Sequence, residues 1–174
     1  AEFAGIDTET GDELIYDLEG NKVVLNATNS VSERKVMGNP YPDFYGGINN
    51  SFEYKNFGID IFFVFNQGQM IYDDHGKRQL GNMGFGCNQD IRTLDYWQEN
   101  GDATNVPTLS LTENRDINSS RHLYDASYVR LRNLSVHYKL SDKICNKLNI
   151  GNLKIFLSAQ NLAVWSKYKG WDPE

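Results

Sequence analysis

The feature that most constrains the fold is a pair of alternating segments on either side of the turn YKNFG, residues 54–58. In residues 44–54 the large apolar side chains share one phase of the alternation, and most polar side chains share the other. Residues 59–65 repeat the pattern with Ile and Phe. A period of two is that of a β-strand with one apolar and one polar face. We therefore predict a β-hairpin.

A second pair of alternating segments lies in residues 127–140 and 153–165. In the first of these the apolar side chains change phase at Arg132-Asn133. A β-bulge shifts the phase of a strand without ending it, so we predict a bulge at this point. The two segments are predicted to form a second hairpin.

The connections between these strands are strongly unequal. Residues 55–58 and 141–152 are short connections, whereas residues 73–123 are a polar, Gly- and Asn-rich connection with one short helix predicted near residues 91–100. A connection this long is either functional or evidence against the strand assignment. Outer-membrane barrels have short turns at one end and long loops at the other, so the asymmetry favours a barrel. An enzyme with one large active-site loop also fits.

The first 40 residues are rich in turn formers. Around LIYDLE and KVVLNATNS they fit two short strands or an ordered loop equally well. They contain neither the basic n-region nor the apolar h-region of a secretory signal, which is expected to have been removed or to lie upstream.

Charge and hydropathy argue against two classes of protein. The formal net charge of −6 argues against a large basic surface for nucleic acid. Even the longest stretches without a charged side chain, such as residues 61–72, are shorter than the roughly 18 to 20 apolar residues of a membrane-spanning helix. Strands cross a bilayer with about 9 to 11 alternating residues, so the low hydropathy is compatible with a barrel.

Aromatic residues gather near the ends of the predicted strands. Such rings favour the lipid headgroup boundary, where one edge is apolar and the other wet. Ordinary aromatic packing in a β-sandwich is an equally good explanation of the pattern alone. The residues are Tyr41, Phe44, Tyr45, Tyr54, Phe57, Tyr72, Tyr124, Tyr128, Tyr138, Trp165, Tyr168 and Trp171.

Specific sequence segments add a family resemblance. NPYPDFYGGINNSFEYKNF (residues 39–57), SYVRLRNLSVHYKL (127–140) and SAQNLAVWSKYKGWDPE (158–174) stand in the order and approximate spacing of the C-terminal barrel region of the SusC/RagA-like TonB-dependent outer-membrane transporters. The resemblance covers nearly the whole chain. One departure is Leu140-Ser141, where many members of the family have a proline, and it is expected only to reshape a turn.

The resemblance implies an all-β fold, with antiparallel strands forming part of a barrel of about 22 strands with long extracellular loops. Residues 1–174 would be one C-terminal part of this barrel. The plug domain and the last strands are expected to lie outside the chain, which ends at Asp172-Pro173-Glu174. The implied location is the bacterial outer membrane, with residues 55–58 and 141–152 facing the periplasm and residues 73–123 facing outside.

The implied function is active import of a nutrient, an oligosaccharide or a peptide, with no enzymatic activity and no cofactor. The implied partners are the rest of the barrel and its plug, a SusD-like surface lipoprotein, TonB, outer-membrane lipid and the substrate, but no nucleic acid. The main alternative is a soluble extracellular β-sandwich that binds carbohydrate. A hydrolase built around the long loop would need a pair of converging carboxylates, which the sequence does not reveal.

The sequence contains no recognisable catalytic or metal-binding motif. The histidines are scattered and are expected to be solvated or lumen-facing, and the acidic cluster around Asp7 to Glu13 is expected to be a solvated loop. The glycine run 81–87 lacks dinucleotide spacing. The two cysteines, Cys87 and Cys145, are expected to be structurally incidental, and their pairing is left open. The histidines are His75, His122 and His137.

Residues of the long loop are the candidates for substrate binding, through aromatic stacking and through hydrogen bonds from amide and carboxylate groups. They are Tyr96, Trp97, Asn100 and Asp102. The competing interpretation is that Tyr96 and Trp97 anchor the loop on its neighbours, because large ordered loops need apolar anchors.

Overall fold

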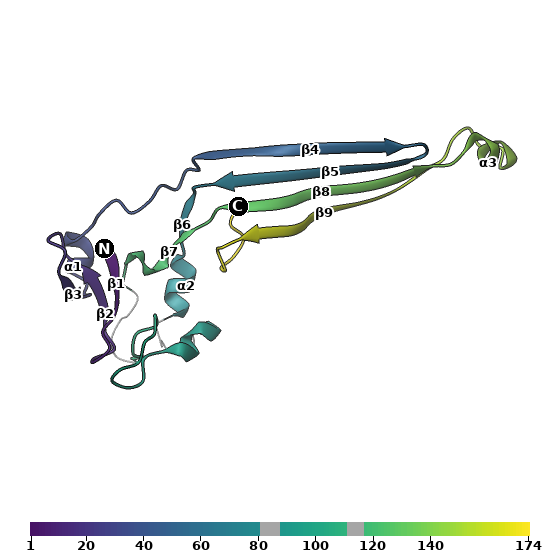
Figure 1. Cartoon of the computed structure of the whole chain (residues 1–174). Helices are drawn as coiled ribbons and strands as arrows, with labels where there is room; N and C mark the ends of the chain where they lie inside the picture. The colour runs from purple at the N-terminus through teal and green to yellow at the C-terminus, as the bar shows by residue number, and fades with distance from the viewer. Residues whose placement is uncertain (81–87, 111–116) are drawn as a thin grey trace. The chain divides into compact units, whose positions relative to one another are not determined.

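The computed structural model describes residues 1–80, 88–110 and 117–174. The chain forms two compact units (Figure 1). Unit 1 comprises Ala1–Gly38 and Ile71–Tyr124, and unit 2 comprises Asn39–Met70 and Asp125–Glu174. Cys87 and the glycine run 81–87 lie outside the described residues, so the pairing of Cys87 with Cys145 stays an open question.

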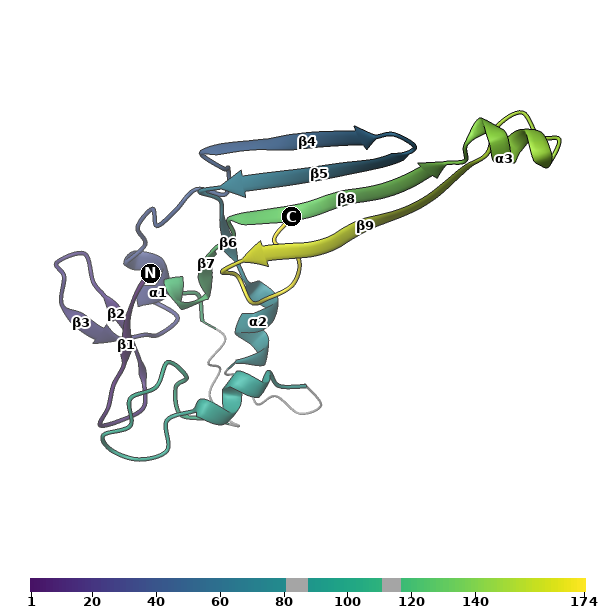
Figure 2. The ribbon, with the colours of Figure 1, turned by 45° about the vertical axis from the view of Figure 1, so that its right-hand side comes forward.

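Unit 2 is built on one sheet of four long antiparallel strands, in the order β4-β5-β8-β9. Figures 1 and 2 show the four strands side by side in this order. Both predicted hairpins are confirmed, and the central pair β5-β8 joins them into one sheet. The strands are β4 (Phe44–Tyr54), β5 (Phe57–Gln67), β8 (Tyr128–Lys139) and β9 (Lys154–Ser166).

Two local irregularities set the register of this sheet. The partners of β5 on β8 step from Asn133 to Leu131, so Arg132 is an extra residue, which confirms the predicted bulge. A second bulge lies in β9, where Asn161 has a φ of 52°. Because each bulge adds one residue, the apolar side chains before and after it stay on the same face of the sheet.

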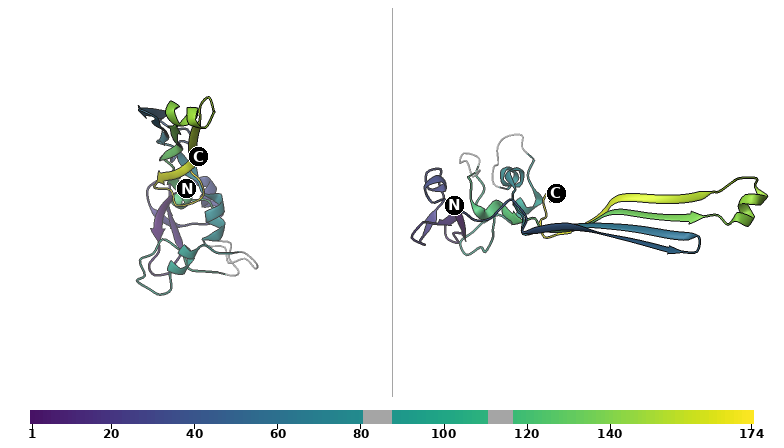
Figure 3. Two further views of the ribbon diagram at one scale, coloured as in Figure 1. Left: turned by 90° about the vertical axis from the view of Figure 1, so that its right-hand side faces the viewer. Right: turned by 90° about the horizontal axis from the view of Figure 1, so that it is seen from above.

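The connections of unit 2 differ in form. Lys55-Asn56 is a two-residue turn, with Lys55 in the left-handed region at a φ of 55°. The connection from β8 to β9 contains the short helix α3 (Asp142–Lys147), in which Cys145 is buried. Figure 3 shows α3 beyond the ends of β8 and β9 and the four strands in a single layer.

Unit 1 starts with a small antiparallel sheet in the order β1-β2-β3, formed by Glu2–Ile6, Glu13–Tyr16 and Lys22–Val24. The prediction left strands or a loop open in the first 40 residues, and the structure has three strands followed by α1 (Asn29–Ser32). Ile15, in the middle strand, is fully buried. This strand therefore supplies part of the core of unit 1.

The rest of unit 1 comes from the long connection. It contains α2 (Asp74–Gln79) and the 3-10 helices η1 (Ile91–Asp95) and η2 (Ser120–His122). The helix predicted near residues 91–100 is confirmed by η1. The strands β6 (Met70–Tyr72) and β7 (Leu123–Asp125) pair where the chain passes between the units. The described parts of the connection, residues 73–80, 88–110 and 117–123, thus carry their own secondary structure, which answers the objection that its length raised.

The structure confirms an antiparallel β-fold with short added helices. Among the described residues no helix is long and apolar enough to span a membrane.

Candidate membrane-facing sheet and loop contacts

One face of the four-stranded sheet is almost wholly apolar, and we call it the apolar face. The cross-strand pairs align its side chains in continuous rows, such as Phe52 with Ile59, Ile59 with Val136, and Val136 with Leu157. The apolar members are Phe44, Ile48, Phe52, Tyr54, Phe57, Ile59, Ile61, Phe63, Phe65, Val129, Leu131, Leu134, Val136, Tyr138, Ile155, Leu157, Ala159, Ala163 and Trp165.

The large side chains of the apolar face are widely exposed. Leu157 is 76% exposed, Phe52 61% and Trp165 56%. Soluble monomers rarely leave contiguous apolar patches of more than a few hundred Å² uncovered. Aromatic rings stand at both ends of the face, with Tyr54 and Tyr138 at the turn end and Phe44 and Trp165 at the other. This arrangement matches an apolar band between two aromatic girdles.

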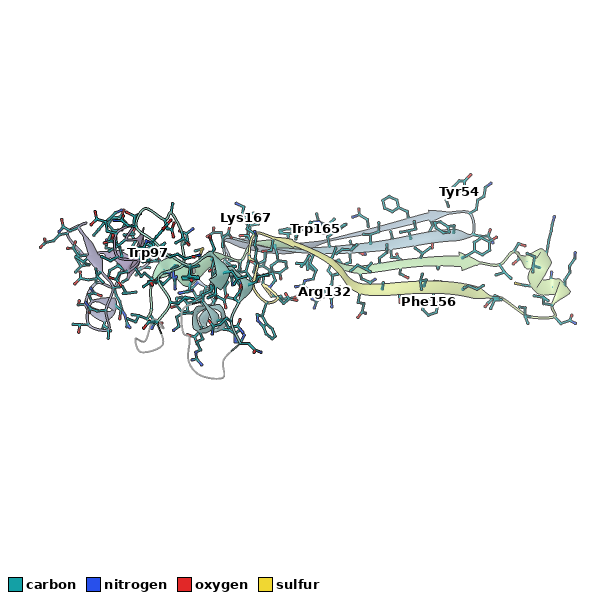
Figure 4. The ribbon with its side chains drawn as sticks, turned by 90° about the horizontal axis from the view of Figure 1, so that it is seen from below. Tyr54, Trp97, Arg132, Phe156, Trp165 and Lys167 are labelled. Carbon is teal, nitrogen blue, oxygen red and sulfur yellow. The ribbon has the colours of Figure 1, made fainter. Side chains whose placement is uncertain are left out.

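All charged side chains of the four long strands lie on the opposite face, which we call the polar face. Pairing puts Asp60 opposite Ser51 and Ser135, and Lys139 opposite Lys154. Figure 4 shows Tyr54 and Phe156 on opposite sides of the sheet, so the polar face also has apolar members. The charged residues are Glu53, Asp60, Arg130, Arg132, Lys139 and Lys154.

A polar cluster surrounds His137 on this face. Its Nε2 lies 3.7 Å from Glu53 Oε1, and its Nδ1 lies 4.0 Å from Asp60 Oδ2. Ser51 donates a hydrogen bond of 2.6 Å to Asp60. The imidazole rests on Gly58, where an added Cβ would lie 2.2 Å from the ring. Glycine is therefore required at this position for the close approach of His137.

The arginines of the polar face bind the C-terminal segment. Arg130 Nη2 pairs with Asp172, and Arg132 Nη1 pairs with Glu174 at 2.6 Å. The side chain of Arg130 is 6% exposed. The hydrogen bond from Arg130 lowers the pKa of the Asp172 carboxyl. These pairs hold residues 172–174 against the polar face of unit 2.

The structure gives Trp97 a well-defined set of contacts in unit 1. Its Nε1 donates to Thr8 O at 3.1 Å, and its backbone N donates to Val106 O at 3.0 Å. The indole also covers Gly11, where an added Cβ would lie 2.5 Å from the ring. Gly11 has a φ of 74°, so both space and conformation require glycine. These contacts are those of a loop anchor, and they leave the substrate prediction for Trp97 untested.

The other substrate candidates are placed differently. Asp102 Oδ2 accepts hydrogen bonds from the backbone N of Gln98 at 2.9 Å and of Glu99 at 3.1 Å, which fixes the turn. Tyr96 forms an isolated bridge with Val106. Asn100 is exposed at the tip of this turn. The four residues thus lie in one short loop segment, as their sequence spacing requires.

A buried ion pair in unit 1 was missed by sequence reasoning. Glu13 Oε2 lies 3.1 Å from Arg121 Nε, and the two side chains are 6% and 7% exposed. Ser119 donates a hydrogen bond to the other carboxylate oxygen of Glu13. The prediction that Glu13 belongs to a solvated acidic loop is therefore wrong. No local pattern announces the pair, because its members are far apart in the sequence.

The three histidines have three different environments. His75 is exposed, in line with the prediction. His137 is only 7% exposed on the polar face, so it is not solvated, and a lumen-facing position for it stays a prediction. His122 is fully buried. Neither ring nitrogen of His122 has a hydrogen-bond partner among the described residues. Burial lowers the pKa of His122 to about 3, so this imidazole is neutral at physiological pH.

No catalytic constellation or metal site emerges from the part of the chain that the structure describes, where no three His, Cys, Asp or Glu side chains are grouped to hold a metal ion. The distinctive feature is the division of the long sheet into an uncovered apolar face and a charged face.

Comparisons with known proteins agree with this geometry. The chain is 36% identical over 168 residues to TonB-dependent receptor P3 of Formosa agariphila, a match that covers 97% of the chain and 16% of the receptor. It is 24% identical over 153 residues to TonB-dependent receptor SusC of Bacteroides thetaiotaomicron, covering 86% of the chain and 14% of SusC. No family profile matches.

Solved structures give the same result. The RagAB peptide transporter matches 99% of this chain and 19% of its own chain, with a TM-score of 0.81 and 28% sequence identity. The RagAB peptide importer in the closed-closed state matches with a TM-score of 0.77 and 30% identity, over 99% of this chain and 20% of its own.

The two-faced sheet and these matches define a segment of a TonB-dependent receptor. Within that class, the chain belongs to the SusC/RagA-like family. It spans 14–16% of the length of the curated relatives that it matches.

Proposed function

We propose that residues 1–174 form part of the wall and outer loops of an outer-membrane β-barrel of about 22 strands, which imports a nutrient by TonB-dependent active transport. The complete protein would import an oligosaccharide or a peptide. The four long strands would cross the membrane, and unit 1 would belong to the extracellular loops.

The uncovered apolar face is the observation that carries this proposal. The strands have 11 to 13 residues, enough for the roughly 9 to 11 that a tilted strand needs to cross the hydrocarbon core. A charged side chain facing lipid at mid-depth costs about 2–4 kcal/mol for Lys or Arg. Keeping every charge of these strands on the polar face avoids this cost and provides groups for a hydrated interior.

The family membership supports the proposed partners. They are the remaining strands of the barrel, a plug in its lumen, TonB, outer-membrane lipid and a SusD-like surface lipoprotein. A relative named RagAB is described as a peptide importer, whereas the other relatives are described only as TonB-dependent receptors or SusC. We therefore keep oligosaccharide and peptide as the two substrate classes.

The loop segment with Tyr96, Trp97, Asn100 and Asp102 is proposed to contact the substrate. Asn100 is the most direct candidate because it is exposed. Replacing Asn100 by Ala in the full-length receptor should weaken substrate binding without changing the folding of unit 1. Replacing Trp97 should instead loosen the loop, because its contacts with Thr8 and Gly11 anchor that segment.

The soluble β-sandwich is not favoured. It requires a second sheet over the apolar face, and no other described element of unit 2 covers that face along the strands. Among the described residues, no strand pairs with the outer edges of β4 and β9, as expected if the sheet continues into neighbouring strands.

Adjacent residues of β8 provide the test. A spin label would be attached at Val136→Cys on the apolar face or at Ser135→Cys on the polar face, in the full-length receptor with Cys87 and Cys145 replaced and reconstituted in lipid vesicles. We expect the label at position 136 to collide with oxygen dissolved in the lipid far more often than the label at position 135. A label at position 136 that is immobile and shielded from oxygen would support the sandwich instead.

A further inference from the structure

Unit 1 contains a cavity of about 340 Å³ that no feature of the proposed transport function explains. Volumes of this order are typical of small-molecule sites, whose walls are mainly apolar with a few polar groups that fix the ligand. Here the apolar wall comes from segments far apart in the sequence, Phe3 in β1, Leu80 after α2, and Val106.

Every polar side chain in the described lining of this cavity can donate a hydrogen bond. Arg92, Arg121, Asn105, Ser120 and Tyr124 all offer N–H or O–H groups, and none of the described residues that line the cavity is Asp or Glu. A guanidinium can only donate hydrogen bonds. The lining therefore favours a ligand group that is rich in acceptors and negatively charged.

Each of the two arginines forms an ion pair with a carboxylate that does not line the cavity. Asp90 binds Arg92 through Nε at 2.9 Å and Nη2 at 2.8 Å, and this interaction raises the pKa of Arg92. Glu13 lies 3.1 Å from Arg121 Nε, and Arg121 Nη1 donates to Asn105 O at 3.0 Å. These contacts fix the guanidinium groups before any ligand arrives, which reduces the entropy cost of binding.

Arg121 also has unused hydrogen-bonding capacity. Its side chain is 7% exposed, and Nη2 has no hydrogen-bond partner among the described residues. Burial lowers the pKa of Arg121, although the nearby charge of Glu13 acts in the opposite direction. A buried donor without a partner is costly, and a bound anion would relieve this cost.

We propose that this cavity binds a carboxylate of the transported ligand, with Arg121 and Arg92 as the recognising groups and Tyr124 and Phe3 beside the ligand body. The proposal rests on the transport function, and it narrows the substrate class to ligands that carry a carboxylate. The carboxylate belongs either to an acidic sugar or to the C-terminus of a peptide, and the planar guanidinium suits both.

Binding to the purified full-length receptor tests the proposal with two matched pairs of probes. The pairs are sodium D-glucuronate with D-glucose, and N-acetyl-L-phenylalanine with its amide. We expect at least one acid to bind about ten-fold or more tightly than its neutral partner. Preference in the first pair alone identifies an acidic sugar, and preference in the second alone identifies a peptide terminus. Equal binding within both pairs, or none of the probes binding, overturns the proposal.

Variants connect the preference to the cavity. Arg121→Gln should reduce the preference to about three-fold or less, but it also breaks a buried ion pair, so hydrogen exchange must show that unit 1 remains folded. Arg92→Gln, with a half-exposed side chain, is the second variant and should reduce the preference in the same direction. Arg78→Gln is the control, because Arg78 is exposed and outside the lining. An unchanged preference in both cavity variants overturns the assignment.

The result is independent of the transport test. Lipid exposure of position 136 and carboxylate preference are measured separately, on the same receptor. If position 136 is not exposed to lipid but the receptor prefers the carboxylate probes, the membrane wall is rejected and the ligand site is kept. If position 136 is exposed to lipid but the probes show no preference, only the ligand site is rejected.

Discussion

Unit 1 and the sheet of unit 2 are stabilised in opposite ways. Unit 1 buries apolar Ile15 together with an ion pair between Glu13 and Arg121, so polar contacts between distant segments contribute to its core. The sheet has long, regular backbone pairing but leaves Phe52 and Leu157 largely exposed. Of the largest fully buried side chains among the described residues, Ile15, Pro107 and His122 belong to unit 1, and Cys145 belongs to α3 in unit 2, outside the sheet.

This difference shows which part depends on its surroundings. Backbone hydrogen bonds fix the strands of the sheet, but the hydrophobic stabilisation of its apolar face requires an apolar environment outside the described chain. Unit 1 contains its own partners and should respond to mutations of its interior.

The largest effect is expected in unit 1. Glu13→Gln leaves the buried Arg121 without its counterion and should destabilise unit 1 by about 3–5 kcal/mol. Glu2→Gln removes a half-exposed pair with Lys35 and should cost at most about 1 kcal/mol. Hydrogen exchange of the full-length receptor measures both. If unit 1 is equally protected from hydrogen exchange in Glu13→Gln and in Glu2→Gln, the buried ion pair does not contribute to the stability of unit 1.

A charge on the apolar face should have the next largest effect. Ile61→Arg puts a cation near the middle of β5 and should destabilise the barrel by about 2–4 kcal/mol. Ser135→Arg is the control, because it adds the same cation to the polar face opposite Asp60. The measurement is denaturant unfolding in lipid vesicles. If Ser135→Arg proved the more harmful change, the assignment of the two faces would be reversed.

The close contact between Gly58 and His137 predicts a smaller loss. Gly58→Ala places a Cβ against the imidazole and should cost about 1–3 kcal/mol through overpacking. The double variant with His137→Ala should recover most of that loss, because the clash is removed. Gly151→Ala, with open space around it, is the control. Unfolding in vesicles distinguishes these cases, and no recovery in the double variant would contradict the contact.

The smallest of the expected effects, taken per pH unit, is the pH dependence of the stability of unit 1. The pKa of His122 is about 3 in the folded protein and 6.5 as the ordinary value, so between these values the unfolded chain binds a proton that the folded chain does not. The contribution of neutral His122 to the free energy of unfolding is therefore fully present above pH 6.5. It is lost as the pH falls toward 3, by at most about 1.4 kcal/mol per pH unit.

Replacing His122 by Gln should flatten this pH profile of unit 1, whereas replacing the exposed His75 by Gln should leave it unchanged. Hydrogen exchange at pH 6.5 and pH 5 measures the slope. An identical slope in the protein with and without His122 would show that another group causes the acid sensitivity.

Much of unit 2 could be predicted from the sequence. The period-two pattern predicted the hairpins of residues 44–65 and 127–165, and the phase change at Arg132 predicted the bulge. Such patterns are readable because each strand residue points to one of two faces, so the position along the strand determines the environment. The resemblance to SusC/RagA-like transporters came from the same segments.

Unit 1 was much less predictable. In the sequence, residues 1–40 and 73–123 have no feature in common that predicts their contact, but Ala1–Gly38 and Ile71–Tyr124 form one compact unit in the structure. Ser119 and Glu13, which share a hydrogen bond, are 106 residues apart. Contacts between irregular segments have no period, so no local signal announced them. Arg121, now the centre of the proposed ligand site, was therefore not among the sequence candidates.

The strands and their two faces can be read from the sequence alone, because alternation is a local property of the backbone geometry, and the family resemblance rests on specific segments of these strands. Only the tertiary structure decided that Glu13 and Arg121 form a buried pair, that His122 is fully buried, and that the donors around Arg121 line one cavity. Burial and charge compensation depend on which distant segments meet, and that information is spread over the whole chain rather than contained in any one stretch of it.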